Sequence, residues 1–195
     1  MKAFLAVLLL SPLTAIADEA PPLELICAYE GASALEAAPN LSAPSPTARA
    51  AVKWIASVAG VSPNFEVFAG DRVPSVAFAA IKNGKRIIVY DVSGFRWTHD
   101  AARWRDVVVM AHEIGHHLGG HAITPAEGPH ARELEADRFA GYAVSLLGGS
   151  LDQALSVLPL FTEEDSATHP GRGRRRDAIT RGWEHGEHIK HGETP

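Results

Sequence analysis

Cysteine is almost absent from this sequence, and its scarcity excludes two kinds of site. Cys27 is the only cysteine in 195 residues, so no disulfide can form within the chain. A metal site built on paired cysteines, such as that of the zinc deaminases, is excluded for the same reason. The residues before Cys27 (Leu23, Glu24, Leu25 and Ile26) are not typical of a lipid attachment site. We therefore expect Cys27 to be a small buried apolar residue.

Long hydrophobic runs are scarce as well. The run near the N-terminus covers residues 3–10, follows a lysine and precedes a small-residue site that ends at Ala17. This order is typical of a signal peptide, so we predict that residues 1–17 are removed. No later segment offers about 18 uninterrupted apolar residues, the length that a membrane helix needs. We expect an exported protein, periplasmic or secreted, without a transmembrane span after signal removal; peripheral association with a membrane complex is compatible with this interpretation.

Basic residues do not outnumber acidic ones. The formal net charge is −5, and removal of the signal peptide takes away Lys2, so the mature chain is more acidic still. A mildly acidic surface argues against nucleic acid as a partner. Proline, serine and alanine gather at residues 39–46, a composition typical of a linker. We predict an N-terminal extension and linker (18–46), one domain (47–185), and a disordered, His-rich tail (186–195).

A short motif in the middle of the chain indicates chemistry. Residues 107–121 read VVVMAHEIGHHLGGH, in which an apolar run typical of a buried helix precedes His112, Glu113 and His116. Four residues on an α-helix advance about 6 Å and about 400°, so the two histidines project from one face within reach of a single ion. Glu113 is turned partly aside and reaches a water on that ion better than the ion itself. This HExxH pattern predicts two metal ligands and a general base.

A third ligand is expected further along the chain. A tetrahedral catalytic zinc takes three protein ligands and leaves one position for water. The sequence ELEADRFA at residues 133–140 opens a second helical pattern. We predict Glu133 as the ligand, because Asp137 lies one turn later on the same face and can accept the free N–H of a ligand imidazole. Glu135 is the rival, but Phe139, four residues after it, cannot play that supporting role.

The metzincin pattern HExxHxxGxxH is excluded by counting. Its third histidine would stand at Ala122, whereas His121 is one residue early. The Met-turn is missing too, because the only methionine besides the initiator is Met110, upstream of the motif. We expect His117 and His121 to be surface or helix-end residues, with the glycine pair at 119–120 ending the helix.

Three segments of the chain together resemble the HtpX-type zinc peptidases. These gluzincins include the CAAX prenyl-protein endopeptidases and periplasmic quality-control proteases. The segments are HEIGHHLGGH, ELEADRFAGYAVSLLG, and a Thr-His-Pro at residues 168–170 with an arginine six residues after its histidine. The resemblance covers roughly residues 51–181. It implies that one zinc ion is bound by His112, His116 and Glu133. It also implies that Glu113 is the catalytic residue and that Asp137 supports the ligand His112.

The same resemblance implies two further residues near the substrate. His169 and Arg175 would lie beside it and stabilise the oxyanion. The chain departs from the family's pattern here, since Gly171 and Gly173 loosen the segment. Three consecutive arginines at residues 174–176 also leave the register of the arginine open.

Around the motif we predict an α+β, mainly helical, zincin-like domain. Thr47 is a candidate cap for a helix that runs to residue 59. Residues 75–81 and 86–91 are candidate strands separated by an Asn-Gly turn, which is typical of a tight hairpin, and residues 65–69 are a third strand. The result would be a small antiparallel sheet beside the HExxH helix. In the family that the chain resembles, an extended substrate pairs with an edge strand next to the metal, and the resemblance implies that this hairpin supplies it.

These predictions favour one function and leave a second open. The first is a zinc-dependent endopeptidase that hydrolyses peptide bonds of exported proteins, misfolded ones among them, with Glu113 as general base. The alternative is a zinc-containing chaperone or binding module for unfolded exported proteins with little or no proteolysis, which would have no need of Glu113. A structural zinc site is disfavoured, because three ligands rather than four are evident. Cys27 has an alternative role to that of a packed apolar residue: its thiol could bind the zinc as a fourth ligand and inhibit the site.

Overall fold

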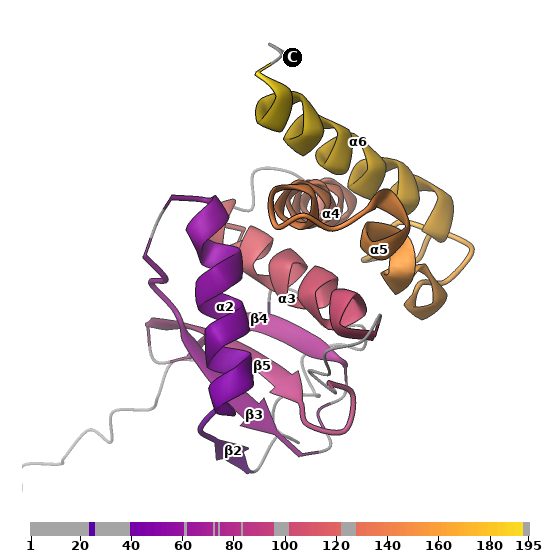
Figure 1. Ribbon diagram of the computed structural model, residues 1–195. Coiled ribbons are helices and arrows are strands. Elements are labelled where there is room, and N and C mark those ends of the chain that lie inside the picture. The colour runs from indigo at the N-terminus through magenta and orange to yellow at the C-terminus, as the bar shows by residue number, and fades with distance from the viewer. Residues whose placement is uncertain are drawn as a thin grey trace, which may run out of the picture.

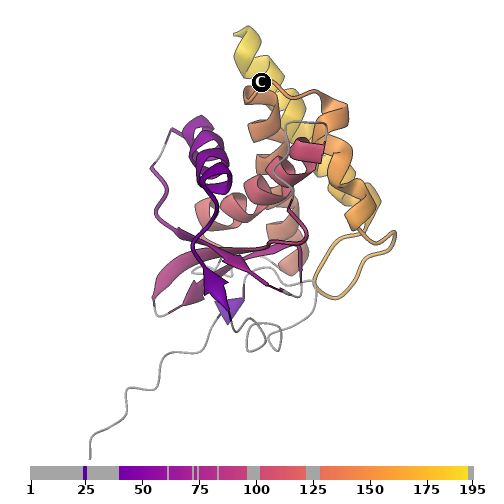
Figure 2. The same cartoon turned by 60° about the horizontal axis from the view of Figure 1, so that its bottom comes forward.

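In the computed structural model, most helices lie on one side of the molecule and the strands on the other (Figure 1). The structure describes residues 24–25, 40–60, 62–71, 73, 75–82, 84–95, 102–121 and 128–192. The fold is α+β, as predicted. Figure 2 shows the helices gathered on one side of a small sheet. The predicted signal peptide (residues 1–17) and Cys27 lie outside the described residues. Within the described ranges, no helix combines the length and the apolar character needed to cross a membrane.

The sheet has five strands in the described part of the chain, in the order β1-β4-β5-β3-β2. Their bounds are β1 (Glu24–Leu25), β2 (Leu41–Ser42), β3 (Glu66–Gly70), β4 (Ala77–Lys82) and β5 (Lys85–Asp91). The predicted hairpin is present as β4 and β5. The prediction of an antiparallel sheet is wrong, because β3 pairs with β5 in parallel. In this order β5 lies between β4 and β3, so the second strand of the hairpin fills the position between two strands that precede it in sequence.

Both faces of the hairpin are buried. Successive side chains of a strand point to opposite faces, so the register divides the hairpin between two apolar clusters. One set faces the helices: Ala77, Ala79, Ile88 and Tyr90. The other set lies on the opposite face with Val73: Phe78, Ala80, Ile87 and Val89. The almost continuous apolar sequence of these strands follows from burial on both sides.

The first long helix starts inside the predicted linker. α2 (Pro46–Val58) begins one residue before the predicted cap Thr47. Ser45 caps it instead, accepting the N–H of Ala48 at 3.1 Å, and Pro46 occupies the first position, where a missing N–H breaks no hydrogen bond. Together with β1 and β2, this places parts of the segment 18–46 within the folded domain.

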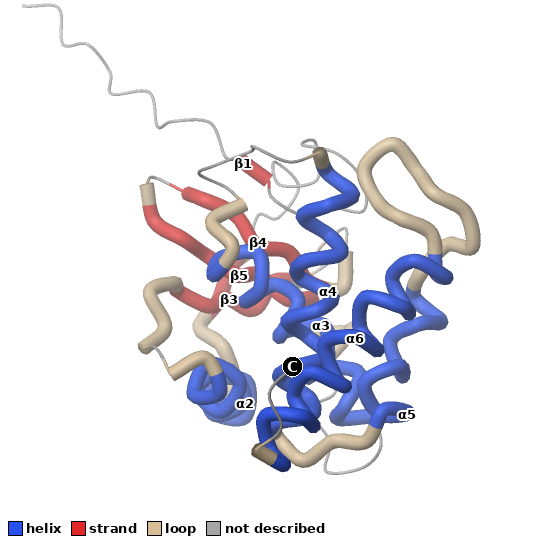
Figure 3. The backbone as a smooth tube through the Cα atoms, turned by 90° about the horizontal axis from the view of Figure 1, so that it is seen from above, coloured by secondary structure: helices blue, strands red, loops and turns tan. Residues whose placement is uncertain are grey.

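The motif helix occupies the centre of the fold. α3 (Ala102–Leu118) packs between the sheet and α4 (Pro129–Leu146), and α4 in turn packs on α6 (Arg172–His191). Figure 3 shows these three helices side by side. The short α5 (Leu151–Ala154) and the 3-10 helix η1 (Leu155–Leu160) return the chain from α4 to α6.

The C-terminal segment is helical where disorder was predicted. α6 continues to His191, so the predicted disordered tail (186–195) is wrong for residues 186–191, and residues 193–195 lie outside the described part. Gly182 and Gly186 explain the helix, because they let α6 approach α4 closely. A Cβ atom on Gly182 would collide with the carbonyl of Arg138. The polar residues that suggested disorder cover the outer face of a packed helix.

Candidate metal centre

Two histidines of α3 and one glutamate of α4 form a single buried group. His112 and His116 are one turn apart on α3, and their Nε2 atoms are 3.0 Å from each other. Glu133 Oε2 lies 3.4 Å from His112 Nε2, and its Oε1 lies 3.3 Å from His116 Nε2. Tetrahedral ligands about 2.0 Å from a zinc ion stand about 3.3 Å apart, so these separations fit zinc. The three residues predicted to bind metal are therefore together and could hold an ion.

A glycine inside the motif allows this convergence. Gly115 stands where α3 meets α4, and a Cβ atom there would lie 3.0 Å from the Cα of Ala136. That is closer than side chains normally pack, so a larger residue would push the helices apart. Glu135, the rival ligand, points elsewhere, with its side chain 51% exposed. The choice of Glu133 over Glu135 agrees with the geometry.

Asp137 holds His112 in the form that binds metal. The Nδ1–H of His112 donates to Asp137 Oδ1 at 2.9 Å, the contact that the sequence predicted. An ionised carboxylate can only accept, so the hydrogen of a neutral His112 is on Nδ1 and its lone pair is on Nε2. Nε2 is the atom that faces Glu133 and His116. The pairing thus aims a lone pair at the centre of the group.

The electrostatics of this group favour one cation. Burial opposes protonation of His112, but hydrogen bonds to Asp137 and Glu133 raise its pKa to about 10. Burial lowers the pKa of His116 to about 4. Burial alone would raise the pKa of Glu133, yet hydrogen bonds to the two imidazoles hold that pKa well below its usual value. An ionised carboxylate between two imidazoles attracts one positive charge, for which a proton and a metal ion compete.

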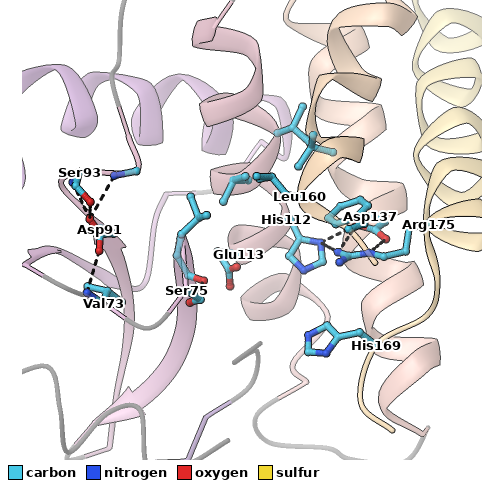
Figure 4. Close-up of a pocket in the computed structure, with 17 residues that line it drawn as sticks. Val73, Ser75, Asp91, Ser93, His112, Glu113, Asp137, Leu160, His169 and Arg175 are labelled. Atoms are coloured by element: carbon cyan, nitrogen blue, oxygen red, sulfur yellow. Dashed lines mark hydrogen bonds and ion pairs between the residues drawn. The ribbon is translucent and has the colours of Figure 1, made fainter. Parts of the chain in front are cut away.

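Glu113 lies beside the group and lines a pocket of about 420 Å³ (Figure 4). The side chain is buried, and among the described residues its Oε2 atom has no hydrogen-bond partner. Burial raises the pKa of Glu113 to about 7, with His112 opposing the shift and Glu133 adding to it. A buried carboxylate with a free oxygen and a pKa near neutrality suits a group that takes and returns a proton.

His169 and Arg175 both reach the site, but in different ways. His169 Nε2 lies 3.7 Å from Glu133 Oε2, and the side chain lines the same pocket. Arg175 is the arginine of the run 174–176 that points inward. Its guanidinium donates to Asp137 at 2.7 and 2.9 Å and lies over the ring of Phe161. Arg175 therefore supports the residue behind His112, a contact that the sequence did not predict.

Two histidines were expected at the surface or at the end of a helix. His117 and His121 do lie at the end of α3, so the second of these alternatives holds. They are only 1% and 5% exposed, so the first is wrong. His117 Nε2 lies 2.9 Å from the carbonyl of Ile87, and its ring stacks on Phe65. His121 contacts the ligand His116 directly, with 2.9 Å between the two Nδ1 atoms. The signal that could have identified His121 is the glycine pair before it, which turns the chain back.

Comparison of the chain with protein-family models, with curated proteins and with solved structures found no match. The resemblance to the HtpX-type peptidases therefore depends on the motif residues alone. The structure adds one observation about these residues: the three candidate ligands lie close enough together to hold one metal ion.

Proposed function

We propose that this protein is a zinc-dependent endopeptidase that cleaves exported proteins, misfolded ones among them. One observation carries the proposal. His112, His116 and Glu133 converge at ligand distances while Glu113, one residue from a ligand, lines the adjoining pocket. A metal site that only stabilises a fold needs a fourth protein ligand and has no use for a buried carboxylate beside it.

The chain's own residues supply the proton transfers. A zinc ion held by the three ligands would lower the pKa of a water ligand and polarise a carbonyl group. Glu113 accepts the proton of the attacking water and then delivers it to the leaving amine. His169 carries a lowered pKa, mainly through burial, and so stays neutral. A neutral imidazole at the pocket wall can donate one N–H to the developing oxyanion.

The pocket beside Glu113 is walled largely by apolar side chains from three parts of the chain: the segment before β4, helix α3, and η1 with the residue after it. The side chains are those of Val73, Val76, Val108, Val109, Val157, Leu160 and Phe161. Such walls favour a peptide that places an apolar side chain next to the bond to be cut. Unfolded proteins expose apolar side chains that folded ones bury, which supports misfolded proteins as the substrate class.

The outer edge of β4 offers backbone groups to an extended peptide. The N–H of Asp91 donates to the carbonyl of Val76, so this pair is hydrogen-bonded across the two strands. In an antiparallel ladder such pairs alternate with pairs whose backbone groups point away from the partner strand. The backbone groups of Ala77, Ala79 and Ile81 therefore point away from β5. The N–H of Ala79 bonds to Glu113, which places this edge beside the candidate base. β1 already pairs with Ala80 and Ile81 further along the same edge. We infer that a substrate strand would lie next to β1.

Replacement of Glu113 by glutamine tests the proposal. We expect the E113Q variant to bind zinc as the parent does but to cleave an unfolded protein at least about 100-fold more slowly, because the amide cannot accept the proton. E164Q, at an exposed position of the loop before His169, is the matched control and should cleave normally. Cleavage is followed by peptide mass spectrometry with and without chelator. Equal cleavage by E113Q and the parent would overturn the role of Glu113.

The same assay separates the peptidase from the alternative binding module. A chaperone would suppress aggregation of an unfolded protein equally well as parent and as E113Q, and neither would release new peptide ends. Parent protein that binds zinc and unfolded protein yet releases no peptides overturns the peptidase and favours the binding module.

We also propose that the protein acts outside the cytoplasm, on the basis of residues 1–17. Mass spectrometry of the protein purified after expression with its full N-terminus should find a mature chain that begins at Asp18. A mature chain that keeps Met1 would contradict export by this route.

A further inference from the structure

The end of α3 brings His121 back beside His116. Gly120 has a φ of 68°, His121 N–H donates to the carbonyl of His116 at 3.2 Å, and Gly120 N–H donates to that of His117 at 3.4 Å. These two bonds around a left-handed residue form a Schellman motif. Gly119 contributes as well, because a Cβ atom there would collide with the ring of His121. The glycine pair thus ends the helix and also places the ring of His121 against His116.

A chain of two hydrogen bonds then runs from Glu135 to His116. His121 Nε2 lies 3.1 Å from Glu135 Oε2, and its Nδ1 lies 2.9 Å from Nδ1 of His116. The carboxylate only accepts, so Nε2 of His121 carries the hydrogen and Nδ1 of the neutral ring has the lone pair. That lone pair accepts the Nδ1–H of His116. The lone pair of His116 is thereby left on Nε2, 3.3 Å from Glu133 Oε1.

We propose that His121, backed by Glu135, is a positioning residue that fixes the tautomer and orientation of the ligand His116. The proposal rests on the metal site of the proposed function. His116 and His121 are 0% and 5% exposed, so bulk water does not replace the bond between them. A carbon atom in place of Nδ1 of His121 would take away the acceptor that the N–H of His116 has among the described residues, which is unfavourable in a buried place.

The two ligand histidines are supported unequally. His112 is held by Asp137, whose carboxylate is itself buried and paired with Arg175. His116 is held through an intermediate ring by Glu135, whose side chain is half exposed. Solvent screens an exposed carboxylate, so the Glu135 end of this chain contributes less than the His121 end. We therefore expect His121 to matter more than Glu135 for zinc affinity.

Three variants test the proposal through zinc affinity, measured by competition with a coloured chelator. H121F keeps a ring of similar size but removes the acceptor, and should lower zinc affinity about 10- to 100-fold, the range found when partners of ligand histidines are removed. H121N keeps an acceptor at the position of Nδ1 and should stay within about threefold of the parent. E135A should fall between the two. Thermal unfolding of each variant without metal shows whether it folds.

A second measurement is independent of affinity and of activity. In the cobalt-substituted parent, proton NMR should show two shifted, exchangeable ring N–H signals, one for each ligand histidine. H121F should lose one of them to exchange with water, while H121N should keep both. If H121F folds and is reduced only in thermal stability, with parent affinity and both signals, His121 is structural and the proposal is overturned.

The outcomes also separate this proposal from the one it rests on. Parent protein that binds no divalent metal overturns both. Parent protein that binds zinc but cleaves nothing overturns the peptidase alone, and the ranking of H121F, E135A and H121N in affinity still decides the role of His121.

Discussion

Arg175 of α6 grips Asp137 of α4 with two hydrogen bonds, Nε to Oδ2 at 2.7 Å and Nη2 to Oδ1 at 2.9 Å. The same Oδ1 atom accepts the N–H of His112. Both side chains of the pair are almost fully buried. The last helix of the described residues therefore reaches the candidate metal centre from behind and sets the orientation of one candidate ligand.

Breaking this pair should affect both stability and metal binding. We expect R175M to lower the free energy of unfolding by about 1–3 kcal/mol, because the buried carboxylate of Asp137 would lose two hydrogen bonds and keep, among the described residues, only that from His112. R174M is the matched control. Arg174 forms an exposed pair with Asp165, and such pairs contribute about 0–1 kcal/mol. Urea unfolding of the two metal-free variants compares them directly. Equal destabilisation would show that the pair with Asp137 is not the reason.

Metal removal should destabilise the folded protein. Zinc in excess stabilises by mass action, by about 4 kcal/mol at a thousand times its Kd, which corresponds to roughly 10 °C in Tm. We expect this difference between zinc-loaded and chelator-treated parent in a thermal melt. The E133A variant, which lacks one ligand, should melt at nearly the same temperature under both conditions. A zinc-dependent rise as large in E133A as in the parent would remove Glu133 from the ligand set.

Two of the three glycines of α6 allow a matched test of helix packing. Gly182 touches the backbone of Arg138, and a Cβ atom there must displace one helix. We expect G182A to lower the free energy of unfolding by about 1–3 kcal/mol. Gly173, on the same helix, has open space around its Cβ position, so G173A should stabilise by about 0.4–1 kcal/mol through the unfolded state. Chemical denaturation measures both. Opposite signs are the expected result, and two destabilised variants would contradict the packing argument.

Asp91 should make stability depend on acidity. Burial would raise its pKa, but hydrogen bonds from Ser93, Gly94 and Val73 outweigh burial and leave the pKa below 3.8. A depressed pKa means that its stabilisation is present at neutral pH and is lost as the pH falls through the folded-state value.

We expect D91A to lower the free energy of unfolding by about 1–3 kcal/mol at pH 7, with the gap to the parent closing as the pH falls below 3.8 and through the folded-state pKa. Urea unfolding at several pH values measures this. Asp177, exposed on α6, is the control, and D177A should follow the parent at every pH. A gap for D91A that does not change with pH would contradict the role of the charge.

The parts of the fold that local sequence determines could be predicted. The hairpin followed from its Asn-Gly turn, and the positions of His112 and His116 followed from helical spacing. The one-turn spacing after Glu133 predicted that Asp137 supports a ligand imidazole, and the family resemblance implied that this imidazole is His112. All three features are present.

Features that depend on distant contacts could not be predicted. The parallel pairing of β3 depends on where β5 lies, which no local pattern contains. The helical C-terminus depends on Gly182 meeting Arg138, 44 positions earlier in the chain. His121 was expected at the surface or the helix end because it is one residue early for the metzincin pattern, and no other local pattern gave it a role. Its burial arises from one left-handed glycine and from Glu135, which reaches it from another helix.

All three candidate ligands come from α3 and α4, and the sheet contributes none. The segment before β4, with Val73 and Val76, contributes only to the pocket wall. Under the proposed function, α3 would both hold the ion and wall the pocket through Val108 and Val109, whereas the segment before β4 would shape the pocket alone. Substitutions at Val73 and Val76 would then redirect which sequences are cut without altering the helices that carry the candidate ligands.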